Sequence, residues 1–169
     1  MISENSFLER SDFLLITRIS LLIIIVESIV IFIYNSFEIQ LENEVSTWPW
    51  YFELPTGVIF APIFESWLCQ YLPFNLFKRF IKEVDTQSFK VFYLLSTGIF
   101  FGLLHSDTIW YMFYGLLAGL GFSYCFYRFK LIYPDSYKPL LFTSLTHSIV
   151  NLLVFITSII YNLSETNFS

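Results

Sequence analysis

The sequence predicts an all-α protein, a polytopic transmembrane bundle of about five helices. Two compositional values favour this class: 56% of the 169 residues are hydrophobic and only 14% are charged, whereas soluble domains carry about 25% charged residues. The third observation is a set of apolar stretches of about 20 residues each, the length that crosses the hydrocarbon core of a bilayer. We expect a single membrane-embedded domain over residues 1–169, because this length fits one domain.

The predicted spans follow one another along the whole chain, at residues 13–34, 54–77, 89–106, 109–127 and 139–160. The first is too long for the apolar part of a signal peptide and has no small-residue cleavage site, so it is expected to remain as a helix. After the second, the alternation of aromatic and basic residues from Phe74 to Val84 predicts a short helix on the membrane surface.

The third and fourth spans are predicted to form an antiparallel hairpin, because only a few residues near Ser106 separate them. Each carries a pair of glycines four residues apart, Gly98 with Gly102 and Gly115 with Gly119. Small residues at this spacing allow helices to approach closely in lipid. We expect the two spans to pack through these glycines.

The distribution of charge predicts a cytoplasmic N-terminus and an external C-terminus, because cations accumulate on the cytoplasmic side. Eight cations fall on one side of the five-span arrangement: Arg10, Lys78, Arg79, Lys82, Lys90, Arg128, Lys130 and Lys138. Acidic residues occupy the other side: Glu38, Glu42, Glu44, Glu53, Asp107 and Glu165. The net charge of −5 and the lack of a long basic stripe exclude nucleic acid as a partner.

Four polar residues inside the spans are the candidate site, because ionisable groups in lipid are costly and usually functional. Glu65 lies in the second span, His105 ends the third, and His147 and Asn151 are one turn apart in the fifth. Counting residues from the cytoplasmic cations brings all four to one layer near the middle of the membrane. A carboxylate there can act as a general base for water, and the other groups can orient that water or stabilise an oxyanion.

Two other interpretations of these residues stay open. The polar groups can simply hydrogen-bond between helices, as polar residues in membrane bundles do. A small transporter with Glu27 and Glu65 as ion sites is less favoured, since no inverted repeat is visible. We expect no cofactor; zinc is the minority alternative, since it would consume Glu65 as a ligand together with His105 and His147.

At these residues the sequence resembles the CAAX protease and bacteriocin-processing (CPBP, or Abi) family of intramembrane endopeptidases, which includes the type II CAAX prenyl endopeptidases. The resemblance covers roughly residues 55–151. It consists of Glu65 after Ala61-Pro62, of Phe101 followed four residues later by His105, and of His147 followed four residues later by Asn151. The family's first motif is a Glu-Glu pair with an Arg four residues after the second Glu. Ser66 and Gln70 replace the second Glu and the Arg here.

The resemblance implies an all-helical intramembrane protease in which Glu65 and His105 activate water and His147 and Asn151 shape an oxyanion site. Its expected partners are the lipid bilayer and a membrane-delivered peptide or protein substrate, in the cytoplasmic membrane of a bacterium. Because Ser66 and Gln70 depart from the motif, the alternative is a catalytically silent member that acts as a membrane immunity, scaffold or partner-stabilising protein.

Overall fold

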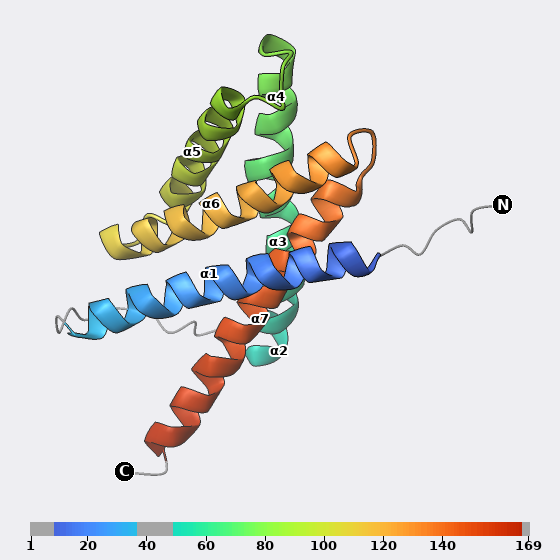
Figure 1. The fold of residues 1–169 in the computed structure, drawn as a ribbon. Coiled ribbons are helices and arrows are strands. Elements are labelled where there is room, and N and C mark those ends of the chain that lie inside the picture. Colours follow the sequence, from blue (N-terminus) through green and yellow to red (C-terminus); the bar gives the residue numbers. More distant parts are fainter. Residues whose placement is uncertain (1–8, 37–48, 167–169) are drawn as a thin grey trace.

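The computed structural model describes residues 9–36 and 49–166, and these residues form a helical bundle without strands. The predicted fold class is therefore confirmed. Among the described residues, four helices are long and apolar enough to cross a membrane: α1 (Arg10–Ser36), α5 (Gln87–Leu104), α6 (Ile109–Ile132) and α7 (Lys138–Thr166). Each overlaps a predicted span and differs from it by a few residues at either end (Figure 1).

The remaining predicted span lies within a continuous helical rod that contains two π-helical turns (Figure 1). In order, the rod comprises α2 (Trp50–Pro55), η1 (Thr56–Phe60), α3 (Ala61–Glu65), η2 (Ser66–Tyr71) and α4 (Leu72–Phe80). The backbone stays in the right-handed helical region at the junctions on both sides of each π turn. The π turns split the rod into short segments, which is why it is not among the four long helices.

Both π turns end just before a proline. Pro62 and Pro73 each occupy the second position of the α-helical segment that follows. A proline lacks an N–H and its ring clashes with the carbonyl four residues earlier in an α-helix. The wider π turn, closed by bonds to the fifth residue, accommodates this mismatch without breaking the rod. In η1, for example, Ala61 N–H donates to the carbonyl of Thr56.

The prediction of a separate surface helix from Phe74 to Val84 is wrong. The rod runs through Pro73 without a break and ends at Phe80, after which Ile81 adopts extended φ and ψ angles of −117° and 105°. A proline near the start of a helical segment does not end the helix, because its missing N–H is tolerated there.

The α5–α6 hairpin packs through its glycines, as predicted. A Cβ atom added at Gly102 would lie 2.8 Å from the carbonyl oxygen of Met112, and one at Gly119 would lie 2.6 Å from the Cβ of Phe101. Contacts this short leave no room for a methyl group, so the absence of side chains at these positions sets the distance between the two helices.

One end of the bundle is held together by a polar contact between α1 and the α6–α7 connection. The hydroxyl of Tyr133 contacts both carboxylate oxygens of Asp12, at 2.9 and 2.8 Å. The ammonium of Lys138 lies 4.5 Å from the centre of the Tyr133 ring. This end also carries Arg10 at the start of α1 and Arg128 near the end of α6, which agrees with the cations gathering on one side. Of the acids predicted for the other side, Glu38, Glu42 and Glu44 lie outside the described residues.

Candidate active site

Glu65 and His147 meet where α3 lies beside α7. The Nε2 atom of His147 is 3.7 Å from Oε2 of Glu65. Glu65 ends α3 and keeps about a quarter of its side chain exposed, whereas His147 is buried. This distance is too long for a direct hydrogen bond, but a single water can contact both atoms.

His105 directly follows α5, and its ring has a defined orientation. Its Nδ1 atom lies 2.8 Å from the carbonyl oxygen of Phe101. A carbonyl only accepts hydrogen bonds, so Nδ1 carries the proton and Nε2 of the neutral ring presents a lone pair. His105 is close enough to Glu65 to interact with it electrostatically. The structure thus brings Glu65, His105 and His147 from three helices into one region.

Aromatic rings surround the two histidines, and of these only Phe101 belongs to a motif visible in the sequence. Phe101 stacks on His105 with 4.4 Å between ring centres and meets His147 edge-on at 5.7 Å. Phe122 stacks on the His147 ring, with 4.1 Å between ring centres. Tyr111 meets His105 at 5.4 Å and interacts electrostatically with Glu65. Aromatic residues make up 21% of the chain, so composition alone could not single these out.

Asn151 makes a contact that its spacing did not predict. Its side-chain amide donates a hydrogen bond of 2.8 Å to the carbonyl of Gly57 in η1. In a π turn, the Gly57 carbonyl would accept a hydrogen bond from the N–H of the residue five positions later. That residue is Pro62, which has no N–H. Asn151 therefore supplies the donor that the Gly57 carbonyl lacks, about two turns before Glu65, and it uses one of its two amide hydrogens to do so.

Ser66 and Gln70 are fully buried in η2, at the positions where the motif has its second Glu and its Arg. Among the described residues, neither the Ser66 hydroxyl nor either polar atom of the Gln70 amide has a hydrogen-bond partner. The Gln70 backbone carbonyl accepts from the hydroxyl of Tyr93 at 3.1 Å. The two positions thus keep polar groups in a closed interior but carry no charge.

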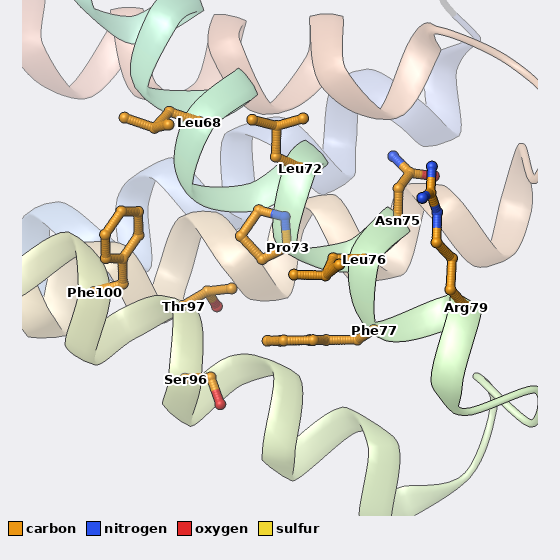
Figure 2. Close-up of a pocket in the computed structure, with 10 residues that line it drawn as sticks. All are labelled: Leu68, Leu72, Pro73, Asn75, Leu76, Phe77, Arg79, Ser96, Thr97 and Phe100. Carbon is orange, nitrogen blue, oxygen red and sulfur yellow. The ribbon is translucent and has the colours of Figure 1, made fainter.

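A groove of about 540 Å³ lies between the rod and α5 (Figure 2). Leu72, Leu76 and Phe77 line it from the rod, and Phe100 lines it from α5. None of Glu65, His105, His147 and Asn151 lines this groove.

Metal ligands are not grouped in the part of the chain that the structure describes. Within residues 9–36 and 49–166, no group of three or more His, Cys, Asp or Glu side chains is arranged to hold a metal ion. The expectation of a metal-free site therefore stays a prediction, to be tested on the purified protein.

The comparison with protein families gives one match, over residues 47–153, which is more than half of the chain. The matching family is described as type II CAAX prenyl endopeptidase Rce1-like. No curated protein and no solved structure gives a significant match. The matched range contains all four candidate site residues.

Proposed function

The chain belongs to the Rce1-like family of type II CAAX prenyl endopeptidases, and on that premise we propose that it is an intramembrane endopeptidase whose Glu65 activates the hydrolytic water. The family is one of proteases, and the four long apolar helices indicate an integral membrane protein. The observation that carries the proposal is the 3.7 Å approach of Glu65 to His147 inside the bundle. We further propose that the N-terminus is cytoplasmic.

In the proposed reaction, the Glu65 carboxylate removes a proton from a water molecule as its oxygen attacks the scissile carbonyl carbon. A C–O bond forms, and the carbonyl π electrons move to oxygen to give a tetrahedral oxyanion. Collapse of this intermediate breaks the C–N bond, and the proton held by Glu65 passes to the leaving nitrogen. A well-placed general base of this kind contributes about 10²- to 10⁴-fold in rate.

His105 is suited to orient the water. Its Nδ1–H is committed to the Phe101 carbonyl, so the lone pair on Nε2 can accept a hydrogen bond from the same water that Glu65 deprotonates. The stacked Phe101 ring fixes the plane of the imidazole. Orientation of this kind lowers the barrier because less freedom is lost in the transition state.

His147 and Asn151 are proposed to stabilise the oxyanion. Both lie on one face of α7, one turn apart. Asn151 retains a second amide hydrogen besides the one donated to Gly57. Donors fixed by packing, as His147 is by Phe122, stabilise developing charge without reorganising during the reaction.

The proposed substrate is a peptide or protein segment delivered through the membrane, and the proposed location is the cytoplasmic membrane of a bacterium. Whether the substrate must be prenylated is decided by offering matched peptides with and without a prenyl group. The proposal requires no metal and no organic cofactor.

The test is cleavage of such peptides by the purified chain in nanodiscs, compared with Glu65→Gln. The expected result is loss of at least about a hundredfold in kcat with unchanged thermal stability, because the carboxylate acts on the transition state. Glu83→Gln, which neutralises an exposed acid in the loop after α4, is the matched control and should retain activity. Equal cleavage by the Glu65→Gln variant and the native chain would refute the proposed role.

One observation favours a second function, that of a catalytically silent member acting as a scaffold, immunity or partner-stabilising protein. Ser66 and Gln70 are neutral, fully buried and without side-chain partners among the described residues. This function predicts no cleavage of any peptide, and it predicts that cells carrying Glu65→Gln behave like cells carrying the native chain.

A further inference from the structure

Glu27 is a buried acid that the proposed reaction does not use. It lies in α1 and is only 5% exposed. The helix packs tightly against α6 here, since a Cβ atom added at Gly121 would lie 2.6 Å from Ile23, one turn before Glu27. A carboxyl group in such a place is costly unless a polar group contacts it.

The side chain that interacts with Glu27 is the phenol of Tyr114, which lies on α6 two turns before Gly121. Tyr114 directly precedes Gly115, and the Cβ of His105 would lie only 2.9 Å from a Cβ added at that glycine. This interaction from α1 therefore reaches α6 at the level where α6 packs against His105.

The contacts continue from Tyr114 to the His105 ring. Tyr111 and Tyr114 are stacked, with ring centres 6.1 Å apart and planes 11° from parallel. The Tyr111 ring in turn meets His105 at 5.4 Å and an angle of 66°. The backbone at Tyr111 is fixed as well, because its N–H donates to the Thr108 hydroxyl at 3.0 Å.

His105 needs this support because of its position in the chain. It directly follows the last residue of α5, Leu104, and lies at the start of a turn, with φ of −109° and ψ of 42°. From α5, Phe101 contacts its ring, through the hydrogen bond to the carbonyl and the stacking contact. Tyr111 supplies the contact from a second helix.

We propose that Glu27 is a positioning residue, which anchors Tyr114 and Tyr111 so that they hold the His105 imidazole in place. α1 then takes part in building the site although it contributes no catalytic residue. The catalytic meaning of this arrangement rests on the proposed function, but the placement of His105 by Glu27 does not.

The experiment uses the fact that the chain has two histidines. The full chain in nanodiscs is labelled with ¹³C,¹⁵N-histidine, and its two ring signals are assigned with His105→Gln. In Glu27→Gln and in Tyr114→Phe, the His105 signal should move while the His147 signal stays. The Glu27→Gln/Tyr114→Phe double variant should give the same displacement as either single variant, because both act through one contact.

Ser28→Ala is the matched control. It alters the next residue of α1, which is exposed and whose hydroxyl bonds to the carbonyl of Ile24 in the same helix. Both histidine signals should stay where they are in the native chain. Tyr114→Phe removes a single oxygen atom, so it keeps the test available if Glu27→Gln folds poorly.

An unmoved His105 signal in Glu27→Gln and Tyr114→Phe overturns the proposal. Equal movement of both histidine signals also overturns it, because that outcome indicates general loosening of the bundle. These spectra do not depend on cleavage, so a chain that cleaves nothing still tests the placement. Where cleavage is measurable, Glu27→Gln should lower kcat by roughly ten- to a hundredfold with little change in KM, as small misplacements of a catalytic group do.

Discussion

The side-chain amide of Asn151 in α7 donates a 2.8 Å hydrogen bond to the carbonyl of Gly57 in the first π turn of the rod. This bond joins the helix that carries His147 to the helical rod that carries Glu65. It couples the stability of the π turn to the geometry of the site, and the first prediction follows from it.

Asn151→Ala should lower the free energy of unfolding by about 1–3 kcal/mol, because it leaves the Gly57 carbonyl without this donor. Thermal unfolding in detergent measures the change. Asn75→Ala is the matched control, since the Asn75 amide donates at the same 2.8 Å but to Tyr71 within its own helical rod. A purely catalytic role for Asn151 would instead leave the two variants equally stable.

Gln70→Arg should strongly reduce the amount of folded protein, because it places an unpaired charge in a fully buried position. The cost of such a charge is about 3–5 kcal/mol. Adding Ser66→Glu, four residues earlier, should restore most of the lost stability by supplying a partner. Membrane abundance and thermal unfolding check both steps.

Gln87→Arg, at the exposed start of α5, is the control for the Gln70 variants and should change stability by less than about 0.5 kcal/mol. If the Ser66→Glu/Gln70→Arg variant is no more stable than Gln70→Arg alone, the two positions do not face each other in the interior.

Gly115→Ala should disturb the site, because the new methyl group would lie 2.9 Å from the Cβ of His105. The hairpin must open or His105 must move, so the expected result is a loss of activity together with about 1–3 kcal/mol of stability. Gly57→Ala is the control, since nothing lies within 4 Å of the added atom. Comparable losses in both variants would indicate a general intolerance of side chains at glycines.

The Asp12–Tyr133 contact predicts a loss of stability at high pH. Burial, and then the hydrogen bond to Asp12, raise the pKa of Tyr133 to about 12, above the ordinary value of about 10. A raised pKa in the folded state means that the contact stabilises fully below pH 10 and that this contribution is lost between pH 10 and 12. Unfolding curves of the native chain and of Tyr133→Phe should therefore converge over this range, and a constant difference would contradict the prediction.

The purified protein should contain no stoichiometric transition metal and should keep its activity after exhaustive treatment with a strong chelator. The reason is that the proposed mechanism uses Glu65 as the base and leaves only two histidines as ligands, whereas catalytic zinc commonly takes about three protein ligands. Metal analysis and cleavage assays check this. Activity that disappears on chelation and returns with zinc would recast Glu65 as a ligand.

The sequence predicted those structural features that depend on the periodicity or spacing of residues along the chain. Apolar stretches of bilayer length predicted the helical bundle, and paired glycines predicted the close packing of α5 on α6. Residue counting placed Glu65 and His147 at similar depths, and their side chains lie 3.7 Å apart.

The details that depend on contacts between distant segments were not predictable in this way. The bond from Asn151 to Gly57 joins residues 94 positions apart, and it arises because a backbone carbonyl lacks its usual donor. The contacts of Tyr111 with His105 could not be inferred either, since nothing in the sequence distinguishes this tyrosine from the ten others. The sequence singled out Glu27 only as a possible ion site of a transporter, and it gave no sign of the neighbouring Tyr114.

The two π turns constrain how the chain can gain or lose residues. Each turn accommodates one residue more than an α-helical turn would, so deleting a residue from Thr56–Phe60 would let η1 close as an α-helix. The parts of the rod on either side would then keep nearly the same relative rotation, whereas deletion of a residue from an α-helical part of the rod would rotate them by about 100°, the angle of one α-helical residue. Because the N-terminal part is joined to Asn151 through Gly57, functional variants can lose one residue at η1 but should keep the length of α3 between η1 and Glu65.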